Sequence, residues 1–388
     1  MRALAGVTLL ALTAVTPLPS QLPPAEWRAF TSRLDAYAAE DRVVGASALL
    51  IRDGRIVARH HYGHADRAAR RRVDERTIFH WASITKTLTA VGIMQLRDRG
   101  KLSLDDPVTR WIPELRRVHD PYGMIDSVTI RMLLTHSAGF QGPTWPWGRG
   151  RAWEPFEPTE WSQLVAMMPY QELVFRPGSR WGYSNPGFVY LGRIIELASG
   201  DPWAVYVQKN IFAPLGLARS YVGATPYHLA ADRSHGYTVA PDPVTGRDTL
   251  LDIGPDFDPG VTIPNSGWNA PLDDLATYAL FLAGRLDRSP GAEPVLSRAT
   301  LEEMWRPAFT LPEDDLHGRA FGLSFYLQPV EGATLVGHWG SQAGYRSFLY
   351  VNPANGSAVA LVFNTTNDVA PAESSLRALL DSTFRLLH

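Results

Sequence analysis

Apolar positions near the start of the chain follow first a helical and then a strand-like spacing. Residues 26–40 ("EWRAFTSRLDAYAAE") place four large apolar residues on one face of a helix: Trp27, Phe30, Leu34 and Tyr37. The next segment, "GASALLIRDGRIVARHHYG", contains two β-rich runs joined by Asp53-Gly54, a strong hairpin signal. We therefore predict a helix followed by a β-hairpin.

Four strand-like runs stand near the other end of the chain, separated by glycine or proline: "FGLSFYLQPV", "ATLVGHWG", "YRSFLYVNP" and "GSAVALVFN". A final amphipathic helix is predicted over residues 372–387. Residues 83–285 are predicted to be mainly helical. Within them a helix should start in "DDPVTRWIPEL", and another, "TIRMLLTHSAG", should end on its glycine.

Strands at both ends with helices between them predict an α+β fold. The expected architecture is one antiparallel sheet built from both chain ends and flanked by helices, with a mainly helical second lobe. The α/β lobe would comprise residues 25–80 and 318–388, and the helical lobe residues 81–317. Residues 21–388 are long enough to form one large single domain, with a site expected between the lobes.

The first 20 residues have the pattern of a secretory signal peptide. Arg2 supplies a basic start, and Ala3–Val15 form an apolar run that is too short to span a bilayer comfortably. No clean cleavage site follows, so a retained N-terminal anchor is the alternative. We expect a periplasmic or secreted protein that has no stable membrane span once the signal is removed.

Composition and charge exclude several classes of protein. The formal net charge of −2, without long runs of like charge, argues against nucleic-acid binding, and the basic run 67–72 is interpreted as a solvated turn. The absence of cysteine excludes a thiol nucleophile, disulfides and cysteine zinc sites. His60, His61 and His64 form no metal motif, because neighbouring residues of a strand point to opposite faces. We expect no metal and no cofactor, and the G-x-S-x-G elbow of α/β-hydrolases is missing.

Lysine is rare in this chain, and one lysine has a serine three residues before it. Three of the 37 Lys+Arg residues are lysines, which leaves 37 − 3 = 34 arginines. A guanidinium does not lose its proton in a protein, whereas a desolvated ammonium can. In "WASITKTLTA", Ser83 and Lys86 share one face if a helix begins at Ser83. This S-x-x-K pair can act as nucleophile and base, although by itself it is about equally well explained by a chance match.

Two further short motifs can complete such a site. Tyr183 and Asn185, in "WGYSNPG", precede an apolar helix. A tyrosine near cations can become a phenolate or relay a proton, and an asparagine can bind a lysine and a substrate amide. His338 begins "HWGS" on a predicted edge strand, where the N–H of Ser341 can lie opposite that of Ser83 and form an oxyanion hole. Taken singly, the tyrosine and the histidine are better explained as packing residues.

Together and in this order, the three motifs closely resemble those of the serine hydrolases of the β-lactamase and penicillin-binding-protein superfamily. The most similar branch holds class C β-lactamases, esterases with a β-lactamase fold and D-amino-acid peptidases. The resemblance extends over about residues 43–361 and includes segments such as "LLTHSAGF", "IFAPLGL" and "GHWGSQAGYRSFLYV". It implies the fold of that superfamily and an acyl-enzyme mechanism.

The resemblance also implies roles for particular residues. Ser83 would be acylated, and Lys86 and Tyr183 would shuttle protons as general base and then acid. Asn185 would orient the substrate and Lys86, and the N–H groups of Ser83 and Ser341 would hold the oxyanion. The substrate-binding residues of this scheme are Asn185, His338, Gly340 and Ser341.

One position departs from the pattern of the superfamily. The third motif of β-lactamases and transpeptidases usually begins with lysine, a cation for the substrate carboxylate, whereas here it begins with His338, which is mostly neutral near pH 7. Neutral esters or amides should therefore be favoured over β-lactams and D-Ala-D-Ala termini, unless Arg346 replaces the missing charge.

The expected function is that of an exported serine hydrolase, most nearly esterase-like, acting on a small-molecule or peptide substrate. Its enzymatic alternatives are a D-Ala-D-Ala carboxypeptidase, a D-aminopeptidase and a class C-like β-lactamase. A non-enzymatic alternative is a peptidoglycan-binding or scaffolding relative.

A tryptophan-rich loop spans residues 144–161. It contains Trp145, Trp147, Trp153 and Trp161 among glycines and prolines. The rings can form an aromatic rim for an apolar substrate or pin the loop by packing, and packing is the preferred interpretation.

Overall fold

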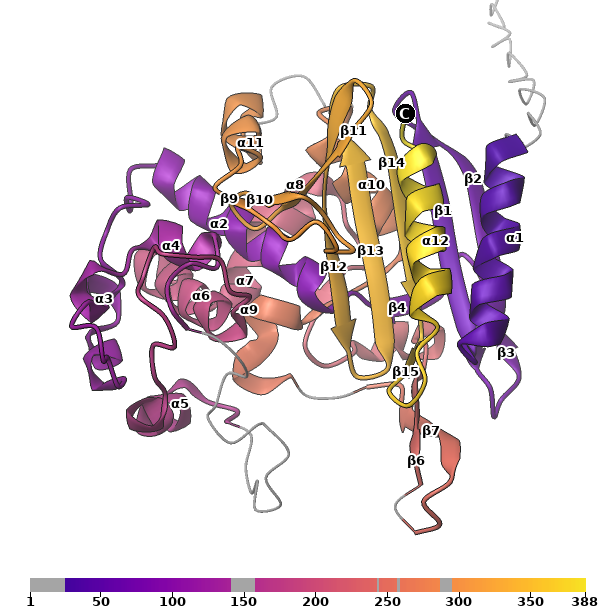
Figure 1. Ribbon diagram of the computed structural model, residues 1–388, viewed down its shortest axis with the longest axis horizontal. Helices are drawn as coiled ribbons and strands as arrows, with labels where there is room; N and C mark the ends of the chain where they lie inside the picture. Colours follow the sequence, from indigo (N-terminus) through magenta and orange to yellow (C-terminus); the bar gives the residue numbers. More distant parts are fainter. Residues whose placement is uncertain (1–24, 141–157, 243, 257–258, 287–294) are drawn as a thin grey trace, which may run out of the picture.

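The computed structural model describes residues 25–140, 158–242, 244–256, 259–286 and 295–388. Figure 1 shows a central sheet with helices on both of its faces. In these ranges, no helix is both long and apolar enough to cross a lipid bilayer. The predicted signal peptide, residues 1–20, lies outside the described residues.

The first two predicted elements are both present. Helix α1 (Ala25–Glu40) buries the four apolar residues of its predicted face. Strands β1 (Gly45–Arg52) and β2 (Arg55–Asp66) form the antiparallel hairpin. At its turn Asp53 and Gly54 have φ values of 51° and 73°. Two successive positive φ values are typical of the type I′ turn, whose twist matches that of the paired strands.

Strands from both chain ends join in one nine-stranded sheet, with the order β3-β2-β1-β14-β13-β12-β11-β10-β9. All of its pairings are antiparallel, including that of β1 with β14, which confirms the predicted sheet. The other strands of this sheet are β3 (Arg71–Arg72), β9 (Phe309–Thr310), β10 (Ala320–Phe321), β11 (Tyr326–Val330), β12 (Ala333–Gln342), β13 (Tyr345–Asn352) and β14 (Ser357–Phe363).

Both faces of the sheet are buried, because alternate residues of its central strands enter two different cores. On β14, Leu361 and Phe363 pack beneath α1 and the C-terminal helix α12 (Glu373–Arg385). Ala360 and Val362 point to the opposite core. Figure 1 shows α1 and α12 side by side on one face of the sheet. A strand buried on both faces is a continuous apolar run, as the sequence of β14 is.

The helical part of the chain covers the other face. Its central helix α2 (Thr85–Asp98) is buried at every position from Thr85 to Leu96, so it lies inside the body of the protein. The other helices of this part are α3 (Val108–Trp111), α4 (Ile130–Leu134), α5 (Trp161–Met167), α6 (Asn185–Ser199), α7 (Trp203–Val207), α8 (Ala213–Leu215), α9 (Ile263–Ser266), α10 (Leu272–Leu282) and α11 (Arg298–Met304).

The segment expected to be mainly helical also contributes strands, which the sequence analysis missed. One small sheet has the order β4-β8-β5 and another the order β15-β6-β7, with β15 parallel to β6. These strands have seven residues or fewer, too short for a periodic signal, and several pair with distant partners. Four of them lie within that segment: β5 (Tyr221–Val222), β6 (Gly236–Pro241), β7 (Asp248–Gly254) and β8 (Trp268–Pro271). Of the other two, β4 (Ile78–His80) precedes the segment and β15 (Thr365–Asn367) follows it.

The helix predicted in "TIRMLLTHSAG" ends earlier than expected. Helix α4 begins with an N-cap at Thr129, whose side chain accepts a hydrogen bond from the Met132 amide, and it ends at Leu134. The predicted stop at Gly139 was therefore wrong. The chain leaves the helix through His136, which adopts a left-handed φ of 55°. Histidine is among the residues that enter this conformation more often than most.

Candidate active site

Ser83 lies in a tight turn between β4 and α2. The residue before it, Ala82, has a φ of 48°, a left-handed conformation that costs a residue with a Cβ atom on the order of 1 kcal/mol. Hydrogen bonds on both sides hold this turn. The Ser347 hydroxyl donates to the Trp81 carbonyl at 2.8 Å, and the Thr85 hydroxyl donates to the Ala82 carbonyl at 2.6 Å. Ser83 is thereby placed at the N-terminal end of the buried helix.

The Ser83 hydroxyl and the Lys86 amine are in direct contact. Lys86 Nζ lies 2.9 Å from Ser83 Oγ, as the spacing of the two residues predicts. Ser83 itself belongs to a 3-10 turn (Ala82–Ile84), so α2 begins later than expected without separating the pair. The second partner of the amine is the carbonyl oxygen of Asn265, at 3.0 Å.

Burial determines the charge of Lys86. Its side chain is fully buried, and the loss of water lowers the pKa of Lys86 well below the usual value for lysine. The rings of Tyr183 and Phe188 lie 5.0 Å and 5.7 Å from Nζ. Aromatic faces at these distances replace only part of the hydration that an ammonium loses. The favoured form is a neutral amine, which can accept a proton from the neighbouring hydroxyl.

Tyr183 borders the same hydroxyl. Burial raises the pKa of Tyr183 above the usual value for tyrosine, and hydrogen bonding with Ser83 lowers it only in part. The phenol therefore keeps its proton near neutral pH. Of the two states that the sequence left open, a phenolate is disfavoured and a protonated phenol able to relay a proton is favoured.

The first turn of α6 places Asn185 in the cleft. Ser184 caps this helix, since its hydroxyl accepts a hydrogen bond from the Gly187 amide at 3.1 Å, and Asn185 is the first helical residue. Asn185 lines the cleft that contains Ser83. Its carbonyl accepts a hydrogen bond from the side chain of Asn265 at 3.4 Å. Asn265 also contacts Lys86, through its main-chain carbonyl; the sequence analysis did not single out Asn265, which lies 179 residues further along the chain.

Strand β12 passes unusually close to the nucleophile turn. A Cβ atom at Gly340 would lie 2.8 Å from the Ser83 amide nitrogen and 2.5 Å from the Trp81 carbonyl oxygen, so only glycine fits without a shift. Although β12 is internal to the sheet, its pairing with β11 ends at Gly337. The part that carries Gly340 and Ser341 is therefore the edge that was predicted, and Ser341 lines the cleft.

His338 is buried and is not among the described residues that line the cleft. Its side chain is 1% exposed, and Nδ1 lies 2.6 Å from the Trp339 carbonyl oxygen, to which it donates when protonated. Burial, followed by the nearby Lys86, lowers the pKa of His338 to about 3. The imidazole is neutral at pH 7, as expected, and its ring packs near those of Tyr183 and Tyr326.

Aromatic rings, with the imidazole of His317 included, make up half of the described lining of the cleft, which has a volume of about 420 Å³. The His317 ring stacks on Trp339 with centroids 4.1 Å apart, and Trp181 stands in the same lining. The sequence analysis assigned no role to these residues, although Trp181 lies two positions before Tyr183 and Trp339 lies within the motif that His338 begins. The described lining residues are Ser83, Trp181, Tyr183, Asn185, Asp315, Leu316, His317, Tyr326, Trp339 and Ser341.

The only ionisable carboxylate among these lining residues is that of Asp315, and the described lining contains no lysine or arginine. Asp315 accepts hydrogen bonds from the amides of His317 (2.8 Å) and Gly318 (3.2 Å). Burial raises its pKa, although these bonds counteract the shift. Arg346, considered as a replacement cation, donates instead to the Tyr37 hydroxyl of α1 at 3.2 Å.

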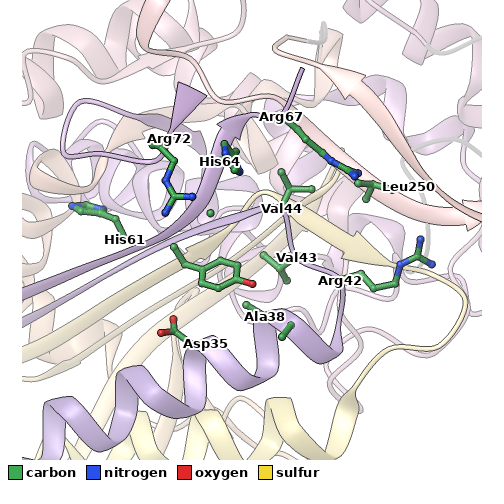
Figure 2. A pocket seen from close by; sticks show the side chains of 13 residues that line it. Asp35, Ala38, Arg42, Val43, Val44, His61, His64, Arg67, Arg72 and Leu250 are labelled. Carbon is green, nitrogen blue, oxygen red and sulfur yellow. The ribbon is translucent and has the colours of Figure 1, made fainter. Parts of the chain in front are cut away.

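A larger hollow of about 720 Å³ lies beside α1 and β2 (Figure 2). Arg42 and Arg72 stand on opposite sides of it and do not converge on one point. Its described lining includes no serine, threonine or lysine, so it offers no nucleophile–base pair. The histidines of β2 have local partners: His60 contacts Asp35 and His61 contacts Ser47, each at 2.7 Å.

Most of the tryptophan-rich loop falls outside the described residues, including Trp145, Trp147 and Trp153. Trp161 begins α5 and packs edge-to-face against Tyr190, with ring centroids 6.3 Å apart. At this one position the ring packs in the helical part of the chain and is not part of the cleft lining.

Comparison with known families agrees with this geometry. Residues 30–383 match the family model described as Beta-lactamase. The chain belongs to the β-lactamase family. The matched range includes every residue that the three motifs singled out.

Relatives within the family carry several different names. The chain is 38% identical over 236 residues to Esterase EstB of Burkholderia gladioli, which covers 56% of this chain and 58% of that protein. It is 27% identical over 312 residues to Penicillin-binding protein 4* of Bacillus subtilis, covering 80% of this chain and 66% of the relative. The chain therefore spans less than two thirds of the length of these curated relatives.

Solved structures share the fold over nearly the whole chain. The octameric penicillin-binding protein homologue from Pyrococcus abyssi superposes with a TM-score of 0.75 at 30% identity, covering 91% of this chain and 76% of that one. A D-stereospecific amidohydrolase from Streptomyces sp. gives 0.70 at 26% identity, with coverages of 92% and 98%. A class C β-lactamase mutant superposes with a TM-score of 0.73 at 19% identity, covering 92% of this chain and 97% of that one. At this identity the match shows a similar fold and nothing more. The expected β-lactamase-like fold is thereby confirmed.

The close approach of β12 predicts the effect of a single methyl group. Gly340→Ala should slow the reaction of Ser83 with a fluorophosphonate probe by about 10²–10³-fold, because the added Cβ pushes one N–H group of the oxyanion pair away from the other. Thr334→Ser is the control, since it removes one methyl group at an exposed position of the same strand. Quenching the labelling reaction at set times and measuring intact masses gives both rates. Equal rates for the two variants would contradict the role of Gly340 beside Ser83.

Proposed function

We propose that this chain is a serine hydrolase that cleaves ester or amide bonds through an acyl-enzyme on Ser83, with neutral esters as its best substrates. The observation that carries the proposal is the 2.9 Å contact between the Ser83 hydroxyl and the Lys86 amine, which desolvation keeps neutral. The proposal requires no metal or cofactor. The relatives named esterase and amidohydrolase support the same class of reaction.

Acylation would begin with transfer of the Ser83 hydroxyl proton to the neutral amine of Lys86. Ser83 Oγ then forms a bond to the substrate carbonyl carbon, and the carbonyl oxygen takes up the electron pair of its π bond. The N–H groups of Ser83 and Ser341 would stabilise the resulting oxyanion, and Gly340 allows β12 to approach closely enough for this role.

Collapse of the tetrahedral intermediate would break the bond to the leaving group. The proton held by Lys86 would pass through the protonated phenol of Tyr183 to the departing alkoxide or amine. In deacylation, a water molecule gives a proton to Lys86 and its oxygen forms a bond to the acyl carbon. The bond between that carbon and Ser83 Oγ then breaks, the proton returns to Oγ, and the carboxylic acid product leaves. Asn185, which lines the cleft, would orient the substrate through hydrogen bonds from its side-chain amide.

The electrostatics of the cleft favour substrates without a carboxylate. No lysine or arginine lines its described part, His338 is neutral, and Asp315 adds a negative charge when ionised. A substrate carboxylate would lose water without gaining an ion pair. Apolar acyl groups, in contrast, would contact the Trp181 and Trp339 rings.

Asp315 supports a second candidate function. A carboxylate on the wall of an otherwise neutral cleft can bind an ammonium group, so an amino-acid amide or ester with a free amine is also a plausible substrate. The Streptomyces amidohydrolase is named as D-stereospecific. Preference for such substrates would make the chain an amidohydrolase of the same mechanism.

The signal-like segment 1–20 supports export to the periplasm or the medium. A binding or scaffolding role without catalysis is not favoured, because such a role has no need of a deprotonated amine beside a serine.

The acyl-enzyme can be tested by direct labelling. A fluorophosphonate probe should add to one serine, and peptide mapping should identify Ser83, because the neighbouring Lys86 activates its hydroxyl. The control is Ser179→Ala, which removes an exposed serine outside the described cleft lining and leaves the nucleophile. Absence of an adduct, or an equal adduct on Ser83→Ala, would falsify the proposal.

The neutral cleft predicts substrate preference. Short-chain p-nitrophenyl esters should be turned over with kcat/KM at least about 10²-fold higher than a chromogenic cephalosporin, because the cephalosporin carboxylate finds no cation in the described lining. Steady-state kinetics on both substrates measure this ratio. A ratio reversed by orders of magnitude would make the chain a β-lactamase instead.

The state of Lys86 predicts the pH dependence. Since desolvation lowers the pKa of Lys86 well below the usual value for lysine, the neutral amine is favoured, and kcat/KM should fall on the acid side as the amine gains a proton. Lys86→Arg should reduce kcat by about 10³-fold or more at every pH, because a guanidinium keeps its proton. Measurement of kcat/KM for an ester over pH checks both. An acid limb that survives unchanged in Lys86→Arg would contradict this role.

A further inference from the structure

A single residue, His136, holds the main chain on both sides of Tyr183. The Gly182 amide donates to the His136 carbonyl at 2.8 Å, and the Ser184 amide donates to His136 Nδ1 at 3.0 Å. Between these two bonds, the Tyr183 ring packs on the imidazole with centroids 4.4 Å apart and planes tilted by 39°. Three contacts from one side chain and its carbonyl thus surround one tyrosine.

His136 is itself held firmly in place. Its amide donates to the Leu133 carbonyl at 3.2 Å, and the next residue, Ser137, donates to the Met132 carbonyl at 2.9 Å. Its left-handed φ of 55° turns the chain out of α4, so the carbonyl and the ring can both face the Tyr183 segment. The side chain is 1% exposed and packs against Phe188 and Phe321, with centroids 5.1 Å away in each case.

The bond to the Ser184 amide determines the state of the imidazole. Nδ1 accepts this hydrogen bond, so Nδ1 carries no proton and the neutral ring holds its proton on Nε2. Burial first, and then Lys86 and His338, lower the pKa of His136 well below the usual value. A protonated imidazole would carry a proton on Nδ1 and could not accept the hydrogen bond from the Ser184 amide. Its positive charge would also lie near Lys86. The hydrogen bond from Ser184 therefore requires the neutral ring.

We infer that His136 is a positioning residue of the site, which holds the Tyr183 phenol against Ser83 and Lys86 by binding the main chain on both sides of it. The inference rests on the proposed function, in which Tyr183 relays a proton. Without the Nδ1 acceptor, the buried Ser184 amide loses its partner and the segment is free to shift. A shift of the phenol affects the proton transfer more than substrate binding, because His136 does not line the cleft.

Two variants of similar size separate the acceptor from the ring. In His136→Asn, the Asn Oδ1 can replace Nδ1 as acceptor and the residue tolerates a positive φ. In His136→Leu the acceptor is lost. For ester hydrolysis we expect His136→Leu to lower kcat by about 10²-fold with little change in KM, and His136→Asn to keep kcat within about tenfold of wild type.

The double-variant cycle with Tyr183→Phe tests whether the effect passes through the tyrosine. If His136 acts by placing the phenol, His136→Leu should cause little further loss of kcat once the hydroxyl is absent. Equal losses in the two backgrounds would overturn the inference, as would equal losses in His136→Asn and His136→Leu. Thermal unfolding identifies variants that fail to fold. In that case His136→Gln, whose amide reaches the place of Nε2 and not Nδ1, replaces His136→Leu in the comparison with His136→Asn.

Failure of the inference on His136 can be distinguished from failure of the proposed function. Fluorophosphonate labelling of Ser83 in the wild type reports on the nucleophile alone. A wild type that is labelled and active, but whose kcat is unchanged by His136→Leu, would contradict only the role of His136. A wild type that is neither labelled nor active would contradict the proposed function itself.

Discussion

A lysine amine without water, 2.9 Å from a serine hydroxyl, is the interaction on which the rest of this site depends. An ammonium in that position would be an inert hydrogen-bond donor. The fold removes its hydration by surrounding α2 with protein at every position of its first three turns, and no carboxylate contact stabilises the charge among the hydrogen bonds of Lys86. The packing of the main core therefore affects catalysis as well as stability, because it removes water from the Lys86 amine and so favours its neutral form.

The same constraint extends to the groups around the amine. Burial is the largest influence on the pKa values of Tyr183, His136 and His338, and in each case it favours the neutral form. A neutral phenol can relay a proton, and a neutral imidazole can accept the Ser184 amide. A site built from neutral groups also lacks a fixed cation for an anionic substrate. Desolvation thus leaves the site without a cation, and Asp315 supplies the one carboxylate of the described cleft lining.

Much of the fold could be predicted because its signals are local. The hairpin at Asp53-Gly54, the face of α1 and the long apolar strands β13 and β14 each follow from spacing and turn chemistry within a few residues. Short strands such as β5 and β8 were missed, since they are stabilised by partners and not by their own pattern. The end of α4 was also misplaced. Its glycine offered a general stop signal, whereas the contacts of His136 with a distant segment determine where the chain leaves the helix.

The sequence by itself determined that Ser83 and Lys86 are neighbours, because residues three apart on a helical turn must share a face. The resemblance singled out Gly340 as a substrate-binding residue, but only the structure shows that the close approach of β12 requires a glycine there. Only the tertiary structure decided that Asn265 contacts the amine, that His136 holds Tyr183, and that Asp315 stands in the cleft. These relations join segments far apart in the chain. Desolvation, which decides the charge of Lys86, is a property of everything packed around a group and cannot be read from its neighbours in sequence.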